Sequence, residues 1–386
     1  MLAAVIIIIF FIPYTASGFA ACGKLFSSLF GMNYMTAMII SAVVIVAYTT
    51  AGGFFAASAT DFVQSIIMTV AIVFVLVFST ISAGGVDAVV ENAKALPGYL
   101  SLTASYIEDT GKSEPYNLLH IITTLSWGLG YFGMPHILLH FMAIEDEKKL
   151  RLSRRVASVW VVIAMAMAVL IGIVGRALSN TGLVDQLHGN DTETIIVRVA
   201  HLLSTYGAFP AIMAGLILAG ILASTMSTAD SQLLAAASSV SENILREAFH
   251  LKISEKKSML AARLTVIGIA ILGIIIARNP DSSVFGIVSF AWAGFGAAFG
   301  PLVICSLFWK RTTLPGAIVG MVSGGAMVFI WKYLIKPIGG VFGIYELLPA
   351  FLVGLVLMVI VSLCTKAPSK EITDEFDRVK AMGKAK

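Results

Sequence analysis

Long apolar runs recur along the whole chain and limit it to one kind of fold. A helix needs about 20 mainly apolar residues to cross a bilayer. Only 12% of the 386 residues are charged and the mean hydropathy is +0.92, whereas soluble domains carry about 25% charged residues. The sequence therefore predicts an all-α polytopic membrane protein with about ten spans. These spans are 2–23, 33–52, 60–82, 118–141, 156–177, 207–240, 258–277, 286–309, 314–335 and 347–364.

Lysines and arginines predict the orientation of these spans. The chain has 26 lysines and arginines. Of these, 18 lie in the connections on one side of the membrane and 8 in the connections on the opposite side, including the ends of spans. Positive charge collects in cytoplasmic loops, so both ends of the chain are expected in the cytoplasm. The longest external connections are then 83–117 and 178–206, and the second has the apolar spacing of a short surface helix within 191–206. The net charge of +4 is small and predicts no nucleic-acid partner.

The span 118–141 contains residues that interrupt a helix. Glycine is a weak helix former, and proline removes a backbone donor and clashes with the preceding turn. Opened backbone survives at membrane depth only inside protein or beside a cavity, and such broken helices build the binding sites of many secondary transporters. We therefore expect this span to open in its middle. The interrupting residues are Gly128, Gly130, Gly133 and Pro135.

Two other interpretations of this stretch remain open. The glycines also match the dinucleotide-binding pattern G-x-G-x-x-G, but that pattern requires a preceding strand, which the sequence does not predict. They also suit close packing between membrane helices. Trp127, Tyr131 and Pro135 are spaced by four, so they share one face wherever an α-helix persists.

The most polar stretch within a span runs from residue 223 to 234. Its hydroxyls, spaced by three and four, form a stripe on one helix face, and hydroxyl and carbonyl oxygens are suitable ligands for a small hard cation. In the alternative interpretation, these hydroxyls bond to carbonyls of their own helix. Asp230 favours the cation, because an acid at membrane depth usually faces a cavity, a partner or an ion. The stripe contains Ser224, Ser227, Thr228 and Ser231.

Three further polar positions stand near spans. Asp61 opens the span 60–82 and suits either a helix N-cap or the inner end of a cation path. His136 and His140 are four residues apart, but no third ligand follows the zinc-site pattern. The sequence offers no serine–histidine–acid or cysteine–histidine arrangement, so it does not predict an enzyme.

With these residues assembled, the chain resembles the sodium:solute symporter family. The resemblance covers about residue 4 to residue 367 and is carried by five motifs. They are YTASG (14–18), GGFFAASATDFVQ (52–64), WGLGYFGMPH (127–136), MST (226–228) and AWAGFGAAFGP (291–301). It implies an inverted five-helix-repeat transporter fold (LeuT-like), with the ion and solute site between the repeats.

The resemblance also assigns roles to individual residues. It implies solute contacts from Tyr14, Trp127, Tyr131 and Pro135. It implies a sodium site formed by the hydroxyls of Ser227 and Thr228 and the carbonyl of Ser224. A second cation site is implied at Asp61, Asp230 and Ser231. The acid at Asp230 departs from the small polar residue that proline transporters of the family carry there, which leaves the number of coupled ions open.

The same resemblance predicts how the chain is divided. Residues 1–365 form a transmembrane domain and 366–386 a cytoplasmic tail. Because the second repeat has five spans and only three precede it, the first repeat is expected to lack two helices, and the chain looks truncated at its N-terminus. Within the domain, 1–82 is the rest of the first repeat, 118–309 the second repeat, and 314–364 holds additional helices.

The function that the resemblance implies is sodium-coupled uptake of L-proline across the cell membrane by alternating access. Its partners are proline or a similar small solute, Na⁺ as coupling ion and only metal, and the lipid bilayer, with no other cofactor. Two alternatives stay open: a sodium symporter for another small carboxylate-bearing solute, and a non-transporting membrane sensor or scaffold. The oligomeric state is not predicted.

Overall fold

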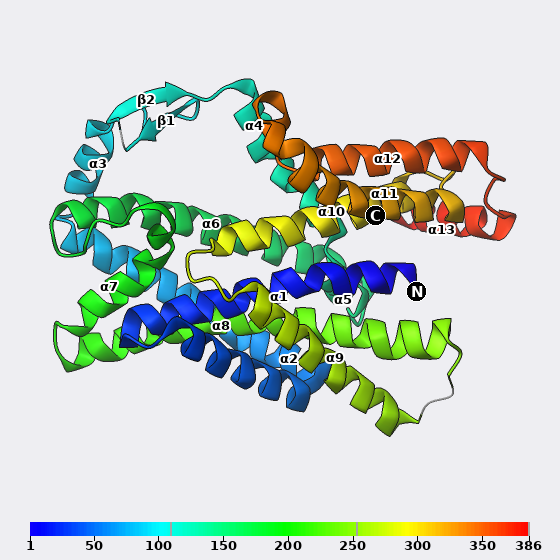
Figure 1. The fold of residues 1–386 in the computed structure, drawn as a ribbon, viewed down its shortest axis with the longest axis horizontal. Coiled ribbons are helices and arrows are strands. Elements are labelled where there is room, and N and C mark those ends of the chain that lie inside the picture. Colours follow the sequence, from blue (N-terminus) through cyan, green and yellow to red (C-terminus); the bar gives the residue numbers. More distant parts are fainter. Residues whose placement is uncertain (109, 252–253, 385–386) are drawn as a thin grey trace.

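The computed structural model describes residues 1–108, 110–251 and 254–384. Within these ranges, nine segments are long and apolar enough to cross a membrane, and they match nine of the predicted spans. Their helices run roughly side by side across Figure 1. The helices are α1 (Leu2–Phe30), α2 (Tyr34–Ser82, which holds two spans), α6 (Leu150–Asn180), α8 (Ala208–Ser238), α9 (Glu255–Ile276), α10 (Val284–Phe308), α11 (Leu314–Ile330) and α12 (Leu347–Cys364).

Helix α2 folds back on itself within its assigned bounds. The hydroxyl of Tyr48 donates a hydrogen bond to that of Thr60, 12 residues later. In a straight helix, 12 residues would separate these positions by about 18 Å. The chain therefore reverses between Tyr48 and Thr60, and its two arms correspond to the predicted spans 33–52 and 60–82. Asn33 caps the start of α2 by accepting from the backbone of Met35 and Thr36.

The two long connections, 83–117 and 178–206, carry small elements of their own. The first contains α3 (Val86–Ala95) and an antiparallel hairpin of β1 (Ala104–Ile107) and β2 (Lys112–Pro115). The all-α prediction missed this hairpin, because its short strands lack apolar alternation. The second connection contains the 3₁₀ helix η3 (Gly189–Thr194) and α7 (Ile195–Ser204), which confirms the predicted surface helix.

Helix α1 forms the centre of the bundle (Figure 1). It packs against α2, α8, α9 and α10, and its middle is buried from Pro13 to Ser17. One large core joins α1 to α10, α11 and α12, and a second, smaller core joins α2, the outer end of α6, α7 and α8. Burial of apolar area against neighbouring helices thus places α1 and α10 deepest in the molecule.

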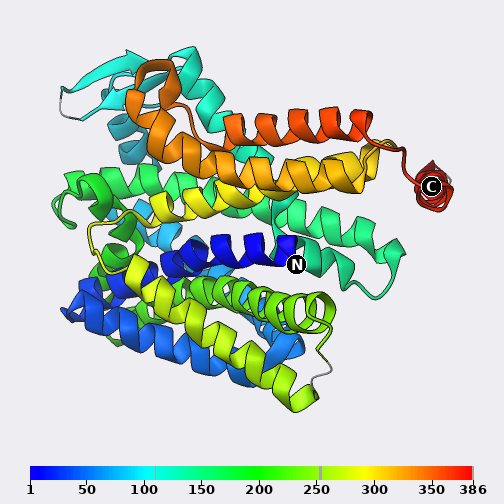
Figure 2. The same ribbon diagram turned by 45° about the vertical axis from the view of Figure 1, so that its right-hand side comes forward.

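The two ends of the chain lie on the right-hand side of Figure 1, opposite the hairpin. On that side α8 continues as the π-helix η4 (Ser239–Ala248). The tail contains α13 (Lys370–Lys384), which sequence analysis did not predict; Asp377 in it pairs with Lys310, and Figure 2 shows the tail helix at the edge of the bundle. Short helical turns complete the fold: η2 (Glu147–Lys149), η5 (Trp331–Ile335), η6 (Lys336–Ile338) and η7 (Gly340–Gly343).

Candidate functional site

The predicted span 118–141 is broken, as its glycines and proline indicated. It consists of α4 (Leu118–Ser126), the 3₁₀ helix η1 (Trp127–Gly133) and α5 (Pro135–Met142). Met134 between them is extended, with φ −78° and ψ 108°, and Pro135 occupies the first turn of α5. Proline fits there because the first-turn N–H has no helical partner in any case. The break therefore places the N-terminus of α5 in the middle of the bundle.

Two glycines let η1 lie directly against α10. A Cβ on Gly133 would stand 2.3 Å from the carbonyl oxygen of Phe295, and one on Gly130 would stand 1.9 Å from Nε1 of Trp292. Both distances are shorter than any real contact of that kind, so a larger residue would push the two segments apart. The close-packing interpretation of these glycines is thus correct, and it holds together with the opened helix.

An aromatic cluster surrounds Trp292, where η1 and α10 meet. The rings of Trp127 and Trp292 stack at 5.2 Å with 12° between their planes, and Tyr131 meets Trp292 edge-on at 4.8 Å. The indole Nε1 of Trp292 donates a hydrogen bond of 3.0 Å to the carbonyl of Trp127. Phe285 and Tyr345 also stack on Trp127. The half-exposed side chain of Tyr131 leaves one side of this cluster open.

Trp127 and Tyr131 do not share one face, because the α-helix on which that expectation depended does not persist. Three residues per turn in a 3₁₀ helix place positions four apart about 120° from each other. The two rings consequently approach Trp292 differently, one face-on and the other edge-on.

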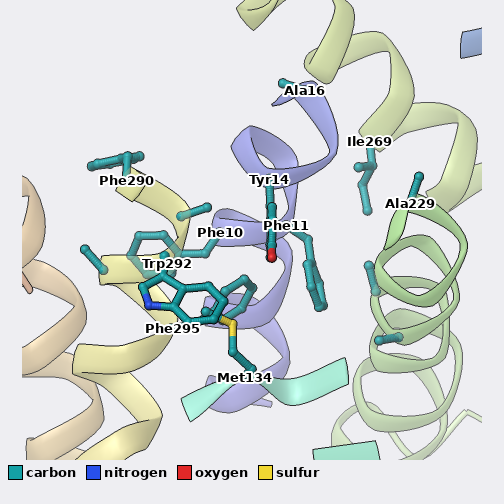
Figure 3. Close-up of a cluster of buried hydrophobic side chains, with 14 of the residues drawn as sticks. Phe10, Phe11, Tyr14, Ala16, Met134, Ala229, Ile269, Phe290, Trp292 and Phe295 are labelled. Atoms are coloured by element: carbon teal, nitrogen blue, oxygen red, sulfur yellow. The ribbon is translucent and has the colours of Figure 1, made fainter. Parts of the chain in front are cut away.

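Tyr14 lies on α1 where this helix passes the break. It is buried, and its ring is 5.8 Å from that of His136 and 6.4 Å from that of Phe295. Figure 3 shows Tyr14, Trp292, Phe295 and Met134 gathered where α1, α10 and the broken span meet. The structure therefore brings the four residues of the expected solute site to one region, from α1 and from both sides of the break.

Three oxygens of α8 converge at the expected sodium position. The hydroxyls of Ser227 and Thr228 both reach the carbonyl oxygen of Ser224, at 3.3 Å and 3.1 Å. Thr228 is exposed, whereas Ser224 and Ser227 are half-buried. These are the hydrogen bonds that serine and threonine make to carbonyls of their own helix, as the alternative interpretation expects.

Asp230 is fully buried one turn below, and Thr49 on the first arm of α2 donates a hydrogen bond of 2.5 Å to its Oδ1. Its Oδ2 is buried without a hydrogen-bond partner, and so is Oδ1 of Asp61. Asp61 and Asp230 lie on α2 and α8, which pack against each other, and Ser231 follows Asp230 on α8. Asp61 lies at the start of the second arm of α2, and its interpretation as an N-cap stays a prediction.

Sequence reasoning overlooked several residues of this region. Trp292 lies in AWAGFG, the motif that carried the resemblance, but nothing in its spacing indicated a contact with η1. Tyr345 donates a hydrogen bond of 2.5 Å to the carbonyl of Ser289 and stacks on Trp127. Thr49 and Asp230 meet across 181 positions of sequence. Such contacts depend on helix pairing, which helical periodicity does not encode.

The sequence pattern of the sodium:solute symporter family matches residues 1–324 of this chain. The chain belongs to the sodium:solute symporter family. This symporter is 38% identical to "Sodium/proline symporter 2" of Staphylococcus saprophyticus, over 100% of this chain and 73% of that protein. It is also 38% identical to "High-affinity proline transporter PutP" of Bacillus subtilis, over 97% of this chain and 74% of that protein.

A solved structure confirms the fold of this symporter. Its title describes a substrate-bound outward-open state of a Na⁺-coupled sialic acid symporter, with a novel Na⁺ site. The match has a TM-score of 0.74 at 18% sequence identity and covers 96% of this chain and 75% of that chain. The predicted LeuT-like transporter fold is therefore correct, and the protein is a multi-pass protein of the plasma membrane.

Proposed function

We propose that this symporter carries L-proline into the cell together with Na⁺, and that it is a transporter rather than an enzyme. The observation that carries the proposal is similarity along the whole chain: proteins named as proline transporters align with 97–100% of it at 38% identity. The opened helix beside an aromatic cluster supports the same conclusion, because midplane sites of transporters are built in this way.

The chemistry of proline fits the region around the break. Proline is a zwitterion with an apolar ring, so its site needs aromatic or aliphatic walls and groups that meet both charges. We infer that Trp127, Tyr131 and Tyr14 form the walls, where an aromatic face attracts the secondary ammonium by about 0.5–2 kcal/mol. Pro135 begins α5, and the positive end of that helix dipole meets the carboxylate.

The coupling ion is proposed to bind where the oxygens of Ser224, Ser227 and Thr228 converge. A second cation is proposed between Asp61, Asp230 and Ser231. Two buried carboxylates near each other repel unless a cation or a proton lies between them. The partnerless carboxylate oxygens of Asp61 and Asp230 supply two of its ligands. This second site rests on the buried carboxylate of Asp230.

Orientation and domain division belong to the same proposal. Both chain ends are placed in the cytoplasm, residues 1–82 and 118–309 in the two repeats, and residues 366–386 in a tail. Cysteine labelling at Lys94→Cys on α3 and Lys256→Cys on α9 tests the topology. Labelling from opposite sides of the membrane is expected, and labelling of both from one side would show that the topology is wrong.

Transport in proteoliposomes tests the function. With an inward sodium gradient, radiolabelled proline is expected to accumulate above its external concentration and to leak out when a sodium ionophore collapses the gradient. Accumulation of a different carboxylate-bearing solute, with no competition from proline, would favour the first alternative. Proline binding without accumulation under any gradient would favour the sensor or scaffold.

A further inference from the structure

A cavity lies against Trp127, on the side away from the chain ends. It has a volume of about 470 Å³, within the range of about 300–1,000 Å³ that small-molecule sites occupy. Its walls come from the last turns of α1, from η3 and α7, from α8 and from the first turns of α10. In the proposed orientation these segments face the outside, so the cavity stands between the external solution and the solute site.

One positive and one negative side chain face each other in the wall of this cavity. Nζ of Lys24 is 2.9 Å from Oε2 of Glu193, and the two side chains are only 13% and 24% exposed. The pair joins the outer end of α1 to η3. Two charges held partly out of water have already lost much of their hydration. A ligand that carries one positive and one negative group can therefore replace the contact between Lys24 and Glu193 at little cost in free energy.

The two members of this pair differ in their other partners. The Glu193 carboxylate also accepts hydrogen bonds from Oγ of Ser283 at 2.8 Å and from the backbone N–H groups of Val284 and Phe285 at 3.2 and 3.3 Å. These donors hold Glu193 at the start of α10. Within the described residues, Glu193 is the only ion-pair partner of Lys24. The flexible Lys24 ammonium is therefore free to change partners, while the carboxylate stays in place.

The rest of the cavity wall is apolar. The indole of Trp127 and the ring of Phe285 lie nearly parallel, with centroids 5.2 Å apart, and Ile221 and Val288 complete the surface near them. A cation, a fixed anion and an apolar wall within one small cavity together match a zwitterionic amino acid with a small apolar side chain. The ligand carboxylate would replace Glu193 at Lys24, and its ammonium would add to the partners of Glu193.

We propose that this cavity, which we call the outer site, binds a zwitterionic amino acid between Lys24 and Glu193 before the ligand passes Trp127. The proposal rests on the proposed function, because it takes the ligand to be the transported solute. Trp127 contributes to both sites, so it separates the outer site from the solute site. Closure of Lys24 on Glu193 behind the departing ligand would then block the way back.

Protection of a cysteine in the cavity wall tests the outer site. Val288→Cys is introduced after Cys22, Cys305 and Cys364 are replaced by alanine, and the protein is reconstituted into liposomes. The rate of modification by a membrane-impermeant thiol reagent is measured with and without proline. At a proline concentration about four times the dissociation constant of the site, proline is expected to slow modification about fivefold, because about four fifths of the sites are then occupied. Proline amide and N-acetylproline, which each lack one charge, are expected not to protect.

Variants separate the outer site from the solute site. Lys24→Met and Glu193→Gln should abolish protection, and Lys24→Arg should retain it. Glu108→Gln is the matched control, because it removes an ion pair with Arg176 outside this cavity and should leave protection unchanged. Tyr131→Ala, which damages the proposed solute site, should also leave it unchanged. Monodisperse elution of each variant shows that it is folded.

Three results would overturn the outer site: no modification of the cysteine, protection that persists in both Lys24→Met and Glu193→Gln, or protection that disappears in Tyr131→Ala. The last result would mean that the Lys24–Glu193 pair only holds α1 against η3. The cysteine would then report occupancy of the solute site. Uptake of proline without protection would refute the outer site alone. Protection without sodium-driven uptake would refute the proposed function alone.

Discussion

Helices α10 and α6 are both apolar, but α10 is buried within the protein and most of α6 lies on its surface. Every residue of α10 from Phe290 to Pro301 is buried, whereas no residue of α6 from Arg151 to Leu170 is buried. The most apolar 18-residue stretch of α6 is nevertheless more hydrophobic than that of α10. In a membrane, apolar character permits contact with lipid as well as with protein, so it does not identify the core. Small residues identify the core better, because they let helix backbones approach one another closely.

A large loss of stability is expected from enlarging a glycine in the packed region. Gly133→Leu would place Cβ 2.3 Å from the Phe295 carbonyl oxygen, and backbone on both sides leaves little freedom to yield. We expect a loss of about 3 kcal/mol in the free energy of unfolding, the upper end for overpacking, measured as a large drop in melting temperature in detergent. Gly128→Ala, where the added Cβ meets nothing within 4 Å, is the control. Equal melting temperatures would contradict the packing described for η1.

A pair of truncations compares the two helices directly. Phe295 on α10 is fully buried and Val162 on α6 is 68% exposed. Phe295→Ala should cost about 3–5 kcal/mol of stability, because it removes a buried ring and leaves a cavity. Val162→Ala should change stability by no more than about 0.5 kcal/mol. Similar losses in chemical unfolding curves of the two variants would mean that a protein surface covers α6.

A smaller effect, on ligand affinity, is expected at the aromatic cluster. Trp127→Ala removes the ring that stacks on Trp292, and we expect proline to bind about tenfold more weakly, which corresponds to about 1.4 kcal/mol. Sodium affinity should change less. Trp160→Ala on α6 is the matched control, since this tryptophan contacts the second arm of α2 rather than the cluster. Calorimetry that finds equal losses for the two variants would remove Trp127 from the solute site.

The sequence predicted features that depend on local composition. Bilayer thickness fixes the length of a span, so nine of the ten runs appear as helices, and the glycines with Pro135 opened the tenth. Features that depend on which helices meet were not predictable from periodicity. They include the contact of Trp292 with η1, the hydrogen bond from Thr49 to Asp230, and the outer cavity between α1, α7 and α10. The site residues taken from the resemblance lie near one another, but their roles remain predictions.

The most direct test of the account is the dependence of proline binding on sodium. If Ser227 and Thr228 hold the coupling ion, proline and Na⁺ must strengthen each other's binding equally, and coupling of this kind is worth about 1–3 kcal/mol. Calorimetric titration of proline at increasing Na⁺, with ionic strength kept constant by choline, should show a dissociation constant that falls and then levels off. In Ser227→Ala and Thr228→Ala, the same fall should require a higher Na⁺ concentration. A proline affinity that is unchanged by Na⁺, or a normal sodium dependence in both variants, would contradict the account.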